Sequence, residues 1–476
     1  MSEWEVVCGL EIHCQIVSKS KVFSGASTEY GSSPNENVSL IDVAMPGMLP
    51  TLNEFCVEQV IKTGLALNAK INNYSEFSRK NYFYADLPAG YQITQYKHPI
   101  VGEGEVEIEL ESGETRKIGI ERIHIEQDTG KSLHDVDPNS TLLDFNRAGV
   151  GLMELVTKPD FRTPEEAGAF LRKLRSIVRY LGTCDGNMDE GSMRCDASIS
   201  VRPKGETTLR NRAEMKNINS IKFVMQAIEV EAKRQIAIYE NGGTINQETR
   251  QFDAALGESK FLRDKESAHD YRYFPEPDLL PLTLDDSFVE KIKGSMPELP
   301  DAKKKRFMEE LGLKEYDARI LSETKEIANY FESALEDSDA KKVANWMMSE
   351  LFAVLNEKGL LIEKSPVSPV NLGKLVRLID DGVISGKIAK EVFEIMVDGD
   401  KDPEAIVAEK GLKQETDLGA LEKVMDELMA SKPEEVAAYR LGRNNLLGFF
   451  VGQVLKASGG KANPAMVNEM VKKKLG

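Results

Sequence analysis

The stretch GLEIHCQI, residues 9–16, decides the first element of the fold. Its apolar residues alternate with polar ones, which is the period of a β-strand with one buried face. Glu11 and His13 are two residues apart, so their side chains point to the same face of an extended chain. The simplest interpretation is a half-exposed strand whose polar face meets water. Other strands of the chain decide whether the two side chains share a role.

Length, charge and cysteine content describe an ordinary globular protein. The chain has 476 residues, too many for one hydrophobic core, and this predicts two to four domains. A net charge of −17 argues against general attraction to nucleic acid, although a local basic patch stays compatible with it. The five cysteines form no C-x-x-C pair, which is typical of reduced thiols. No apolar run is long enough to cross a bilayer and no signal peptide is recognisable, so we expect a cytoplasmic protein without membrane contact.

The secondary-structure pattern of the sequence changes near residue 290. Before that point short β-like runs are interleaved unevenly with helical segments, which is typical of an α+β domain. One such helix is expected to begin after Thr163, with Pro164 in its first turn, and to end at Gly182. From Ala302 onward the pattern is helical, with a break at VDGDKDPEAI. We predict an α+β domain over 1–294, an all-α helical domain over 295–408 and a small all-α tail over 409–476.

Several familiar catalytic motifs are missing. DTGKS, residues 128–132, resembles half of a P-loop, but the leading glycine would have to fall at Ile125. There is no G-x-S-x-G elbow, no H-E-x-x-H helix and no serine- and glycine-rich amidase loop. Any amide chemistry would therefore need ammonia that is made elsewhere.

Acidic residues recur on the β-like runs of the first domain. RIHIEQD repeats the opening pattern with His124 and Glu126, Asp196 lies in another run, and Glu214 lies beside Lys216. Such strands can line a concave sheet with carboxylates, and this surface needs a cation to be stable. Oxygen-rich ligation suits Mg²⁺, with Mn²⁺ as the alternative when a histidine joins. A divalent ion without a P-loop suggests ATP-dependent phosphoryl transfer.

A basic and aromatic segment, SRKNYFYADLPAGYQITQY, covers residues 78–96. Arg79 and Lys80 precede five aromatic residues, which include Tyr82 and Phe83. Phe83 and at least one tyrosine are expected to pack in the core. The Arg-Lys pair beside tyrosines could equally bind a phosphate and stack on a base.

The C-terminal end of the chain is basic. Between Tyr439 and Gly476 one acid, Glu469, accompanies seven basic residues: Arg440, Arg443, Lys456, Lys461, Lys472, Lys473 and Lys474. This segment is either a solvated helix face or a surface that contacts a phosphate backbone.

Motifs along nearly the whole chain resemble one family, the B subunit of the tRNA-dependent amidotransferase that acts on mischarged Glu-tRNA(Gln) and Asp-tRNA(Asn). The matching stretches are GLEIHCQI, MPGMLPTLN, RKNYFYADLPAGYQITQY, RIHIEQDTGKS, DFNRAGVGLMELVTKPD, EGSMRCDASISVRP, EMKNINS, DYRYFPEPDLLPL and LLGFFVGQVLKASGGKANPAMVNEMV.

The resemblance implies a fold and a reaction. The first domain would have a glutamine-synthetase-like cradle fold, and the tail would resemble a small tRNA-associated helical module. ATP would phosphorylate the side-chain carboxylate of Glu or Asp esterified to tRNA, and ammonia would then displace phosphate to form the amide. A partner A subunit would release the ammonia from glutamine and deliver it through a channel, and a small C subunit would complete a heterotrimer.

The resemblance also implies roles for residues. Glu11, His13 and Glu126 correspond to the ligands of a catalytic Mg²⁺, and Asp196 and Glu214 correspond to acids that line the same site. The metal would lower the repulsion between ATP and the substrate carboxylate, which is charge stabilisation rather than proton transfer.

Four further residues complete the predicted site. Lys80 corresponds to a basic residue near the phosphates, with a catalytic role, and His124 is a neighbour of the metal strand. Arg79 and Tyr82 join them as cofactor-binding residues because of the basic and aromatic pattern around them.

One departure from the family concerns zinc. Some members bind zinc through cysteine pairs just before the M-P-G segment, where this chain has Ser39 and Asp42, so we expect no zinc. Two alternative functions stay open: a non-catalytic tRNA-binding scaffold, and a stand-alone ATP-dependent amide ligase.

Overall fold

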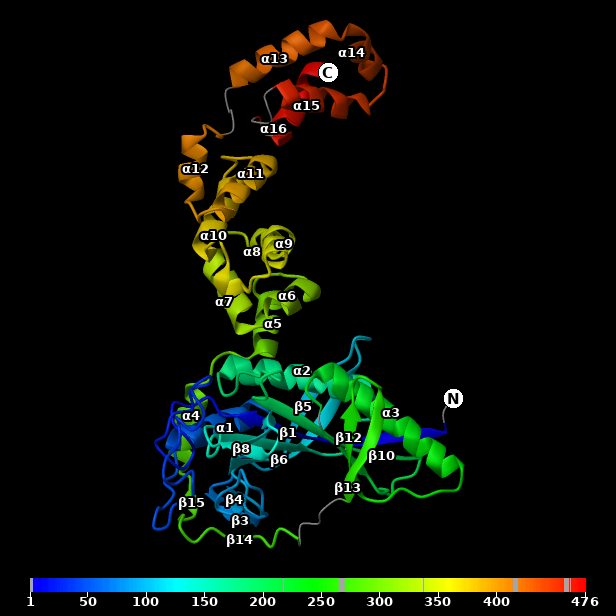
Figure 1. The fold of residues 1–476 in the computed structure, drawn as a ribbon. Coiled ribbons are helices and arrows are strands. Elements are labelled where there is room, and N and C mark those ends of the chain that lie inside the picture. Colours follow the sequence, from blue (N-terminus) through cyan, green and yellow to red (C-terminus); the bar gives the residue numbers. More distant parts are fainter. Residues whose placement is uncertain are drawn as a thin grey trace. The chain divides into compact units, whose positions relative to one another are not determined.

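The computed structural model describes residues 3–216, 218–264, 270–336, 338–413, 418–457, 462 and 464–476. The chain divides into two compact units, Met1–Leu299 and Pro300–Gly476. The first is a mixed α/β unit with a large sheet, and the second is helical (Figure 1). An α+β region followed by a helical region is thereby confirmed.

The large sheet organises the first unit. Within the described residues it has eight strands in the order β13-β12-β11-β10-β1-β9-β6-β5, and neighbours are antiparallel except for β11 and β12. The strands are β1 (Trp4–Gln15), β5 (Gly104–Glu109), β6 (Thr115–Gln127), β9 (Gly151–Thr157), β10 (Met193–Pro203), β11 (Ala213–Lys216), β12 (Glu248–Asp253) and β13 (Glu258–Asp264). The opening stretch of the sequence thus lies in the interior of the sheet.

Short strands bring distant segments together beside this sheet. They are β2 (Tyr74–Ser75) with β15 (Leu282–Thr283), β3 (Ser78–Asn81) between β4 (Tyr91–Thr94) and β14 (Phe274–Pro275), and the hairpin β7 (Lys131–Asp137) with β8 (Ser140–Asp144). Because β14 pairs with β3, the residues just before Phe274 lie near Lys80.

In the described part of this unit, the helices beside these strands are α1 (Glu54–Ala66), α2 (Pro164–Leu181), α3 (Ile221–Glu240) and α4 (Asp286–Gly294). Figure 1 shows α2 and α3 along one face of the sheet. The predicted ends of α2 are confirmed, since Thr163 forms a capping box with Glu166 and Gly182 adopts a left-handed φ of 72°.

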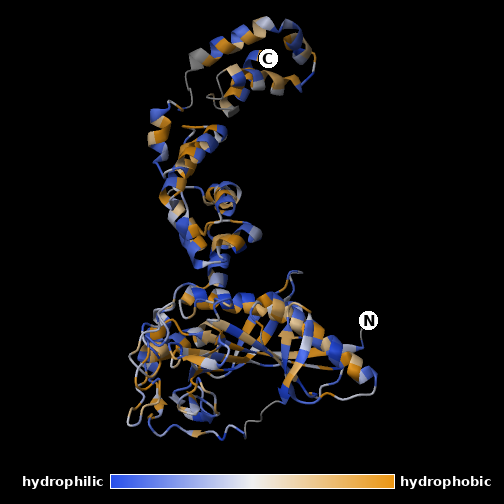
Figure 2. Cartoon of the chain, in the orientation of Figure 1, coloured by the Kyte–Doolittle hydropathy of each residue, from blue (hydrophilic) through white to orange (hydrophobic). Residues whose placement is uncertain are grey.

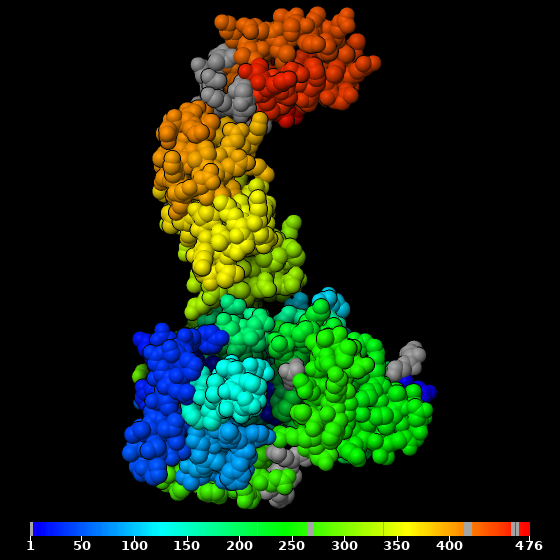
Figure 3. Space-filling view, in the orientation of Figure 1, coloured from blue at the N-terminus to red at the C-terminus, as the bar shows by residue number. Residues whose placement is uncertain are grey.

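The alternation of β1 separates the core from a polar face. Leu10, Ile12 and Cys14 are buried in the hydrophobic cluster that also contains residues of α2 and α3. Glu11 and His13 therefore point to the opposite face of the sheet, as predicted. In the space-filling view the blue-to-cyan and green segments of this unit lie side by side (Figure 3).

The expectation that Phe83 packs in the core is wrong. Strand β3 ends at Asn81, so the alternation does not continue through the aromatic residues, and 76% of Phe83 is exposed.

The second unit is built from amphipathic helices, along which hydrophobic and hydrophilic residues intermix (Figure 2). They are α5 (Pro300–Glu309), α6 (Glu315–Leu321), α7 (Lys325–Leu335), α8 (Ala340–Trp346), a π-helical turn (Met347–Leu351), α9 (Phe352–Lys358), a 3₁₀ turn (Ile362–Lys364), α10 (Pro369–Asp380), α11 (Gly386–Val397), α12 (Pro403–Glu409), α13 (Leu418–Ser431), α14 (Pro433–Arg440), α15 (Leu446–Ala457) and α16 (Pro464–Leu475).

Among the side chains that the structure describes here, one buried cluster runs from Phe307 to Val407 and another from Leu421 to Leu475. Among the described residues, none of the helices has the length and hydropathy that a bilayer crossing requires.

Candidate active site

The polar face of the sheet gathers side chains from five neighbouring strands. Strand register places His13 of β1 opposite Glu154 of β9, and Glu154 in turn opposite His124 of β6. On the other side of β1, Glu11 lies opposite Asp196 of β10. Because paired residues of antiparallel strands share a face, the register alone brings these groups together.

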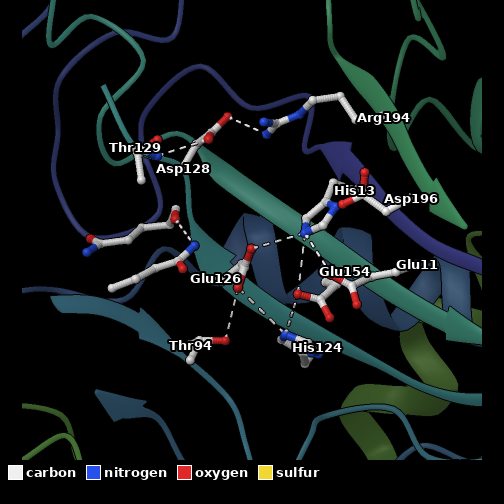
Figure 4. Close-up of polar contacts among 12 residues, drawn as sticks. Glu11, His13, Thr94, His124, Glu126, Asp128, Thr129, Glu154, Arg194 and Asp196 are labelled. Atoms are coloured by element: carbon white, nitrogen blue, oxygen red, sulfur yellow. Dashed lines mark hydrogen bonds and ion pairs between the residues drawn. The ribbon is translucent and has the colours of Figure 1, made fainter. Parts of the chain in front are cut away.

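Two histidines lie among the carboxylates (Figure 4). The Nε2 atom of His13 is 3.4 Å from Glu154, 3.6 Å from Glu126 and 3.9 Å from Glu11, measured to the nearest carboxylate oxygen. The Nε2 atom of His124 is 3.3 Å from Glu154 and 3.7 Å from Glu126. Glu154 is therefore the carboxylate that both imidazoles approach most closely.

A second acidic group adjoins the first through Glu11. Ligand atoms of Glu11, Asp196 and Glu214 all lie within 4.8 Å of one another. The Lys216 ammonium donates to Asp196 over 2.6 Å and lies 3.4 Å from Glu214. This part of the face is thus partly neutralised by the protein itself.

Crowding of charges shifts the pKa values of these groups. The negative field of Glu154, followed by burial, raises the pKa of Glu11 to about 7. Burial is the largest influence on His13 and works to lower its pKa, but contacts with Glu154, Glu126 and Glu11 outweigh it and raise the pKa to about 9. Burial likewise opposes ionisation of Glu154, yet His124 and His13 hold the pKa of this carboxyl well below its usual range.

The polar face of the sheet lines one side of a cavity of about 290 Å³. The sheet contributes Glu11, His124, Glu126, Glu154, Glu214 and Lys216 to its lining. The opposite side is formed by Lys80, Tyr96, Tyr271 and Tyr273. A cavity of this size with convergent polar groups and shifted pKa values has the features of a ligand site.

The donor set fits a divalent cation. Ligand atoms of Glu11, His13 and Glu154 lie within 4.8 Å of one another, as do those of His124, Glu126 and Glu154. The Nδ1 atom of His124 is buried and has no hydrogen-bond partner among the described residues. Carboxylate oxygens with an imidazole suit Mg²⁺ or Mn²⁺, and such an ion would relieve the repulsion that raises the pKa of Glu11.

Lys80, which was expected near the phosphates, lines this cavity. Its ammonium is 5.0 Å from the centre of the Tyr271 ring and 5.8 Å from that of Tyr82. Burial works to lower the pKa of Lys80, but the fields of Glu126 and Glu154 outweigh it and raise the pKa. Lys80 therefore carries a positive charge opposite the carboxylates.

The other two residues of the predicted basic and aromatic site do not line the cavity. Arg79 donates to Glu276 through two hydrogen bonds of 2.7 Å and is 4.1 Å from the centre of the Tyr91 ring. Tyr82 stays beside Lys80, and its hydroxyl donates to Gln92 over 2.9 Å. Arg79 thus holds a protein carboxylate rather than facing the site.

Sequence reasoning missed Glu154 and the two tyrosines after residue 270. Glu154 stands in the apolar run GLMELV, where a single charged residue is itself a signal of function. The Tyr273 ring stacks on Tyr96 with centroids 4.2 Å apart and planes 4° from parallel. Their segments are far apart in the sequence and are joined through β3, which pairs with β4 on one side and with β14 on the other.

Comparison with known proteins agrees with this architecture. Residues 6–290 match the family model described as the GatB/GatE catalytic domain, and residues 329–475 match the model described as the GatB domain.

Curated relatives resemble the chain over its whole length, and each is named as the B subunit of an aspartyl/glutamyl-tRNA(Asn/Gln) amidotransferase. The protein of Rhodospirillum rubrum is 59% identical over 472 residues, covering 99% of this chain and 97% of its own length. That of Paramagnetospirillum magneticum is 58% identical over 473 residues, covering 99% and 98%. That of Rhizobium meliloti is 58% identical over 479 residues, covering 100% and 95%.

Proposed function

Because the chain belongs to the family of B subunits of the aspartyl/glutamyl-tRNA(Asn/Gln) amidotransferase, we propose that it completes the conversion of mischarged tRNA to the correct amide. It is a ligase that converts Glu-tRNA(Gln), Asp-tRNA(Asn) or both to Gln-tRNA(Gln) and Asn-tRNA(Asn). ATP phosphorylates the side-chain carboxylate, and ammonia then displaces phosphate from the acyl phosphate.

The observation that carries this proposal is that Glu11, Glu126 and Glu154 line one cavity together with Lys80. His13 contacts all three carboxylates. Phosphorylating a carboxylate requires two anions to meet, so the site must offset negative charge. A cation-binding face opposite a charged lysine meets that requirement.

In the proposed mechanism the sheet holds the cation and positions its ligands. We keep Glu11, His13 and Glu126 as proposed ligands, since Glu126 lies 3.6 Å from His13. We add Glu154, because its carboxylate lies within 4.8 Å of ligand atoms of Glu11 and His13. Thr94 donates to Glu126 over 3.2 Å and so fixes that carboxylate. A bound divalent ion would draw phosphate oxygens and the substrate carboxylate together by offsetting their charges.

Lys80 and the aromatic side of the cavity complete the site. The Lys80 ammonium would hold phosphate oxygens as charge moves from the nucleotide to the acyl group. The stacked Tyr96 and Tyr273 rings offer an aromatic wall beside the reacting atoms.

The remaining family properties are part of the same proposal. Ammonia comes from a glutaminase A subunit, a small C subunit completes a heterotrimer in the cytoplasm, and the first domain has a glutamine-synthetase-like cradle fold. We retain the division at 1–294, 295–408 and 409–476, with the tail binding tRNA through its basic residues. Lys461 of that basic set lies outside the described residues.

The test uses the assembled complex with glutamine, ATP and mischarged tRNA. Replacing His13 or Glu11 by Ala should abolish ATP-dependent amide formation, while the glutaminase activity of the partner persists. Glu107→Gln, on the exposed face of β5, is the control and should leave amide formation intact. Unchanged amide formation in the His13 variant would leave only a scaffold role.

The alternative hypothesis of a stand-alone amide ligase makes a different prediction. It requires ATP turnover with a small acceptor in the absence of tRNA and partner subunits.

A further inference from the structure

Positive side chains around the cavity differ in what balances their charge. Lys216 is paired with Asp196 and Glu214, and Arg122 is paired with the neighbouring Glu121. Arg212 also lines the cavity, yet no carboxylate among the described residues lies within ion-pair distance of its guanidinium. Its charge is therefore available to a ligand.

The backbone that carries Arg212 is held firmly. In the loop between β10 and β11, the guanidinium of Arg210 lies beside the stacked rings of Trp4 and Tyr239, 5.4 and 5.1 Å from their centres. Arg210 also forms hydrogen bonds of 3.0–3.3 Å with both carboxylate oxygens of Glu206. The next residue, Asn211, donates from its side-chain amide to the carbonyl of Ile245 over 2.8 Å.

These contacts fix the loop up to the residue before Arg212. A guanidinium on an anchored backbone loses less conformational freedom when it binds a ligand than one on a free loop.

Strand register places a second arginine, Arg263, on the same edge of the sheet as Arg212. Arg212 directly precedes β11, and Glu214, two residues later, lies opposite Thr249 of β12. Thr249 lies opposite Arg263 of β13, which also lines the cavity. Arg263 donates to the hydroxyl of Tyr84 over 2.9 Å, which ties this edge to the segment of Lys80.

We propose that Arg212 binds the phosphates of the nucleotide, with Arg263 as its neighbour on the same edge. The proposal rests on the proposed function, because it requires a nucleotide in this cavity. A guanidinium donates to two phosphate oxygens at once, which a lysine cannot do in the same plane. The carboxylates of the polar face repel a triphosphate. Arg212 lines the same cavity and gives the phosphates an attractive contact away from Glu11 and Glu214.

The experiment measures binding of a non-hydrolysable ATP analogue with Mg²⁺ to the assembled complex by isothermal titration calorimetry. Arg212→Ala should weaken binding about ten- to a hundredfold, the loss expected for a charge-assisted hydrogen bond, and Arg212→Lys should restore part of it. Lys204→Ala is the matched control, because Lys204 is exposed in the same loop and does not line the cavity. It should bind the analogue like the wild type.

The outcomes separate the two proposals. If the wild-type complex binds the analogue and Arg212→Ala binds it equally well, the role of Arg212 is overturned and the proposed function stands. A variant with normal nucleotide affinity and a raised KM for aminoacyl-tRNA also overturns it, because Arg212 would then serve the substrate carboxylate. Failure of the wild-type complex to bind the analogue would contradict the proposed function itself.

Discussion

His13 of β1 and Glu154 of β9 lie directly opposite each other, with Nε2 of the imidazole 3.4 Å from the carboxylate. His124 approaches the same carboxylate from β6 over 3.3 Å. Glu154 thus contacts a histidine on each side of β9. The proposed cation site depends on Glu154 more than on any other single residue.

Lys80 is expected to be essential for phosphoryl transfer. Lys80→Met removes the positive charge held opposite Glu126 and Glu154, and we expect ATP-dependent amide formation to fall at least about a hundredfold. The measurement is amide formation by the complex, with glutaminase activity as an internal reference. Lys97→Met, an exposed lysine of the following segment, is the control. Normal amide formation in Lys80→Met would remove this residue from the mechanism.

A buried ion pair that does not line the cavity is expected to stabilise the fold. Lys21 is fully buried, and its ammonium donates to Asp42 over 2.9 Å. Asp42→Ala would leave a buried, unpaired ammonium, so we expect the free energy of unfolding to fall by about 3–5 kcal/mol in urea titrations. The double change of Lys21→Met with Asp42→Leu should recover much of this stability. Glu105→Gln, in an exposed pair with Lys117, should leave the midpoint nearly unchanged.

The buried thiols predict a loss of stability at alkaline pH. Burial raises the pKa of Cys8 to about 12 and that of Cys56 to about 11, against roughly 8.5 in an unfolded chain. Above about pH 9 the unfolded state releases protons that the folded state keeps, so stability falls as pH rises towards 11–12 and is unaffected by these groups below pH 8.

Urea titrations at pH 8 and at about pH 10 measure this loss of stability. Thiol labelling at pH 8 tests the burial that causes it. The native protein should react slowly at all five cysteines, which are buried, and the urea-unfolded protein should react fully. Rapid labelling of Cys8 in the native protein would contradict the predicted burial.

The basic tail is best tested by substitution, because Phe450 and Val471 are fully buried in its core and a deletion would remove them. Lys472 and Lys473 are exposed on α16. Changing both to Gln should weaken tRNA binding and reduce the slope of log K against log salt by about 1 for each phosphate that is no longer bound. The exposed pair Lys341 and Lys358 serves as the control. An unchanged slope would mean that these two lysines form a solvated face.

Local patterns predicted much of this structure. The alternation of GLEIHCQI correctly separated the core and polar faces of β1, because a period of two follows from the geometry of an extended strand. Thr163 and Gly182 correctly marked the ends of α2, because caps act through neighbouring backbone groups.

Features that depend on distant contacts were not predictable in the same way. Arg79 was expected at the phosphates, yet its partner Glu276 is 197 residues away. Strand β9 is buried almost throughout, so its pattern has no alternation that would single out Glu154. Phe83 was expected in the core, but the end of β3 at Asn81 leaves it exposed.

The most direct test of the central claim is a titration of the complex with Mn²⁺, followed by electron paramagnetic resonance. The wild type should bind Mn²⁺ in competition with Mg²⁺. Glu154→Gln should weaken Mn²⁺ binding at least about tenfold, because it removes a carboxylate ligand of the ion that also contacts two histidines. Glu107→Gln should bind like the wild type. Equal Mn²⁺ affinity in the wild type and Glu154→Gln would contradict the account.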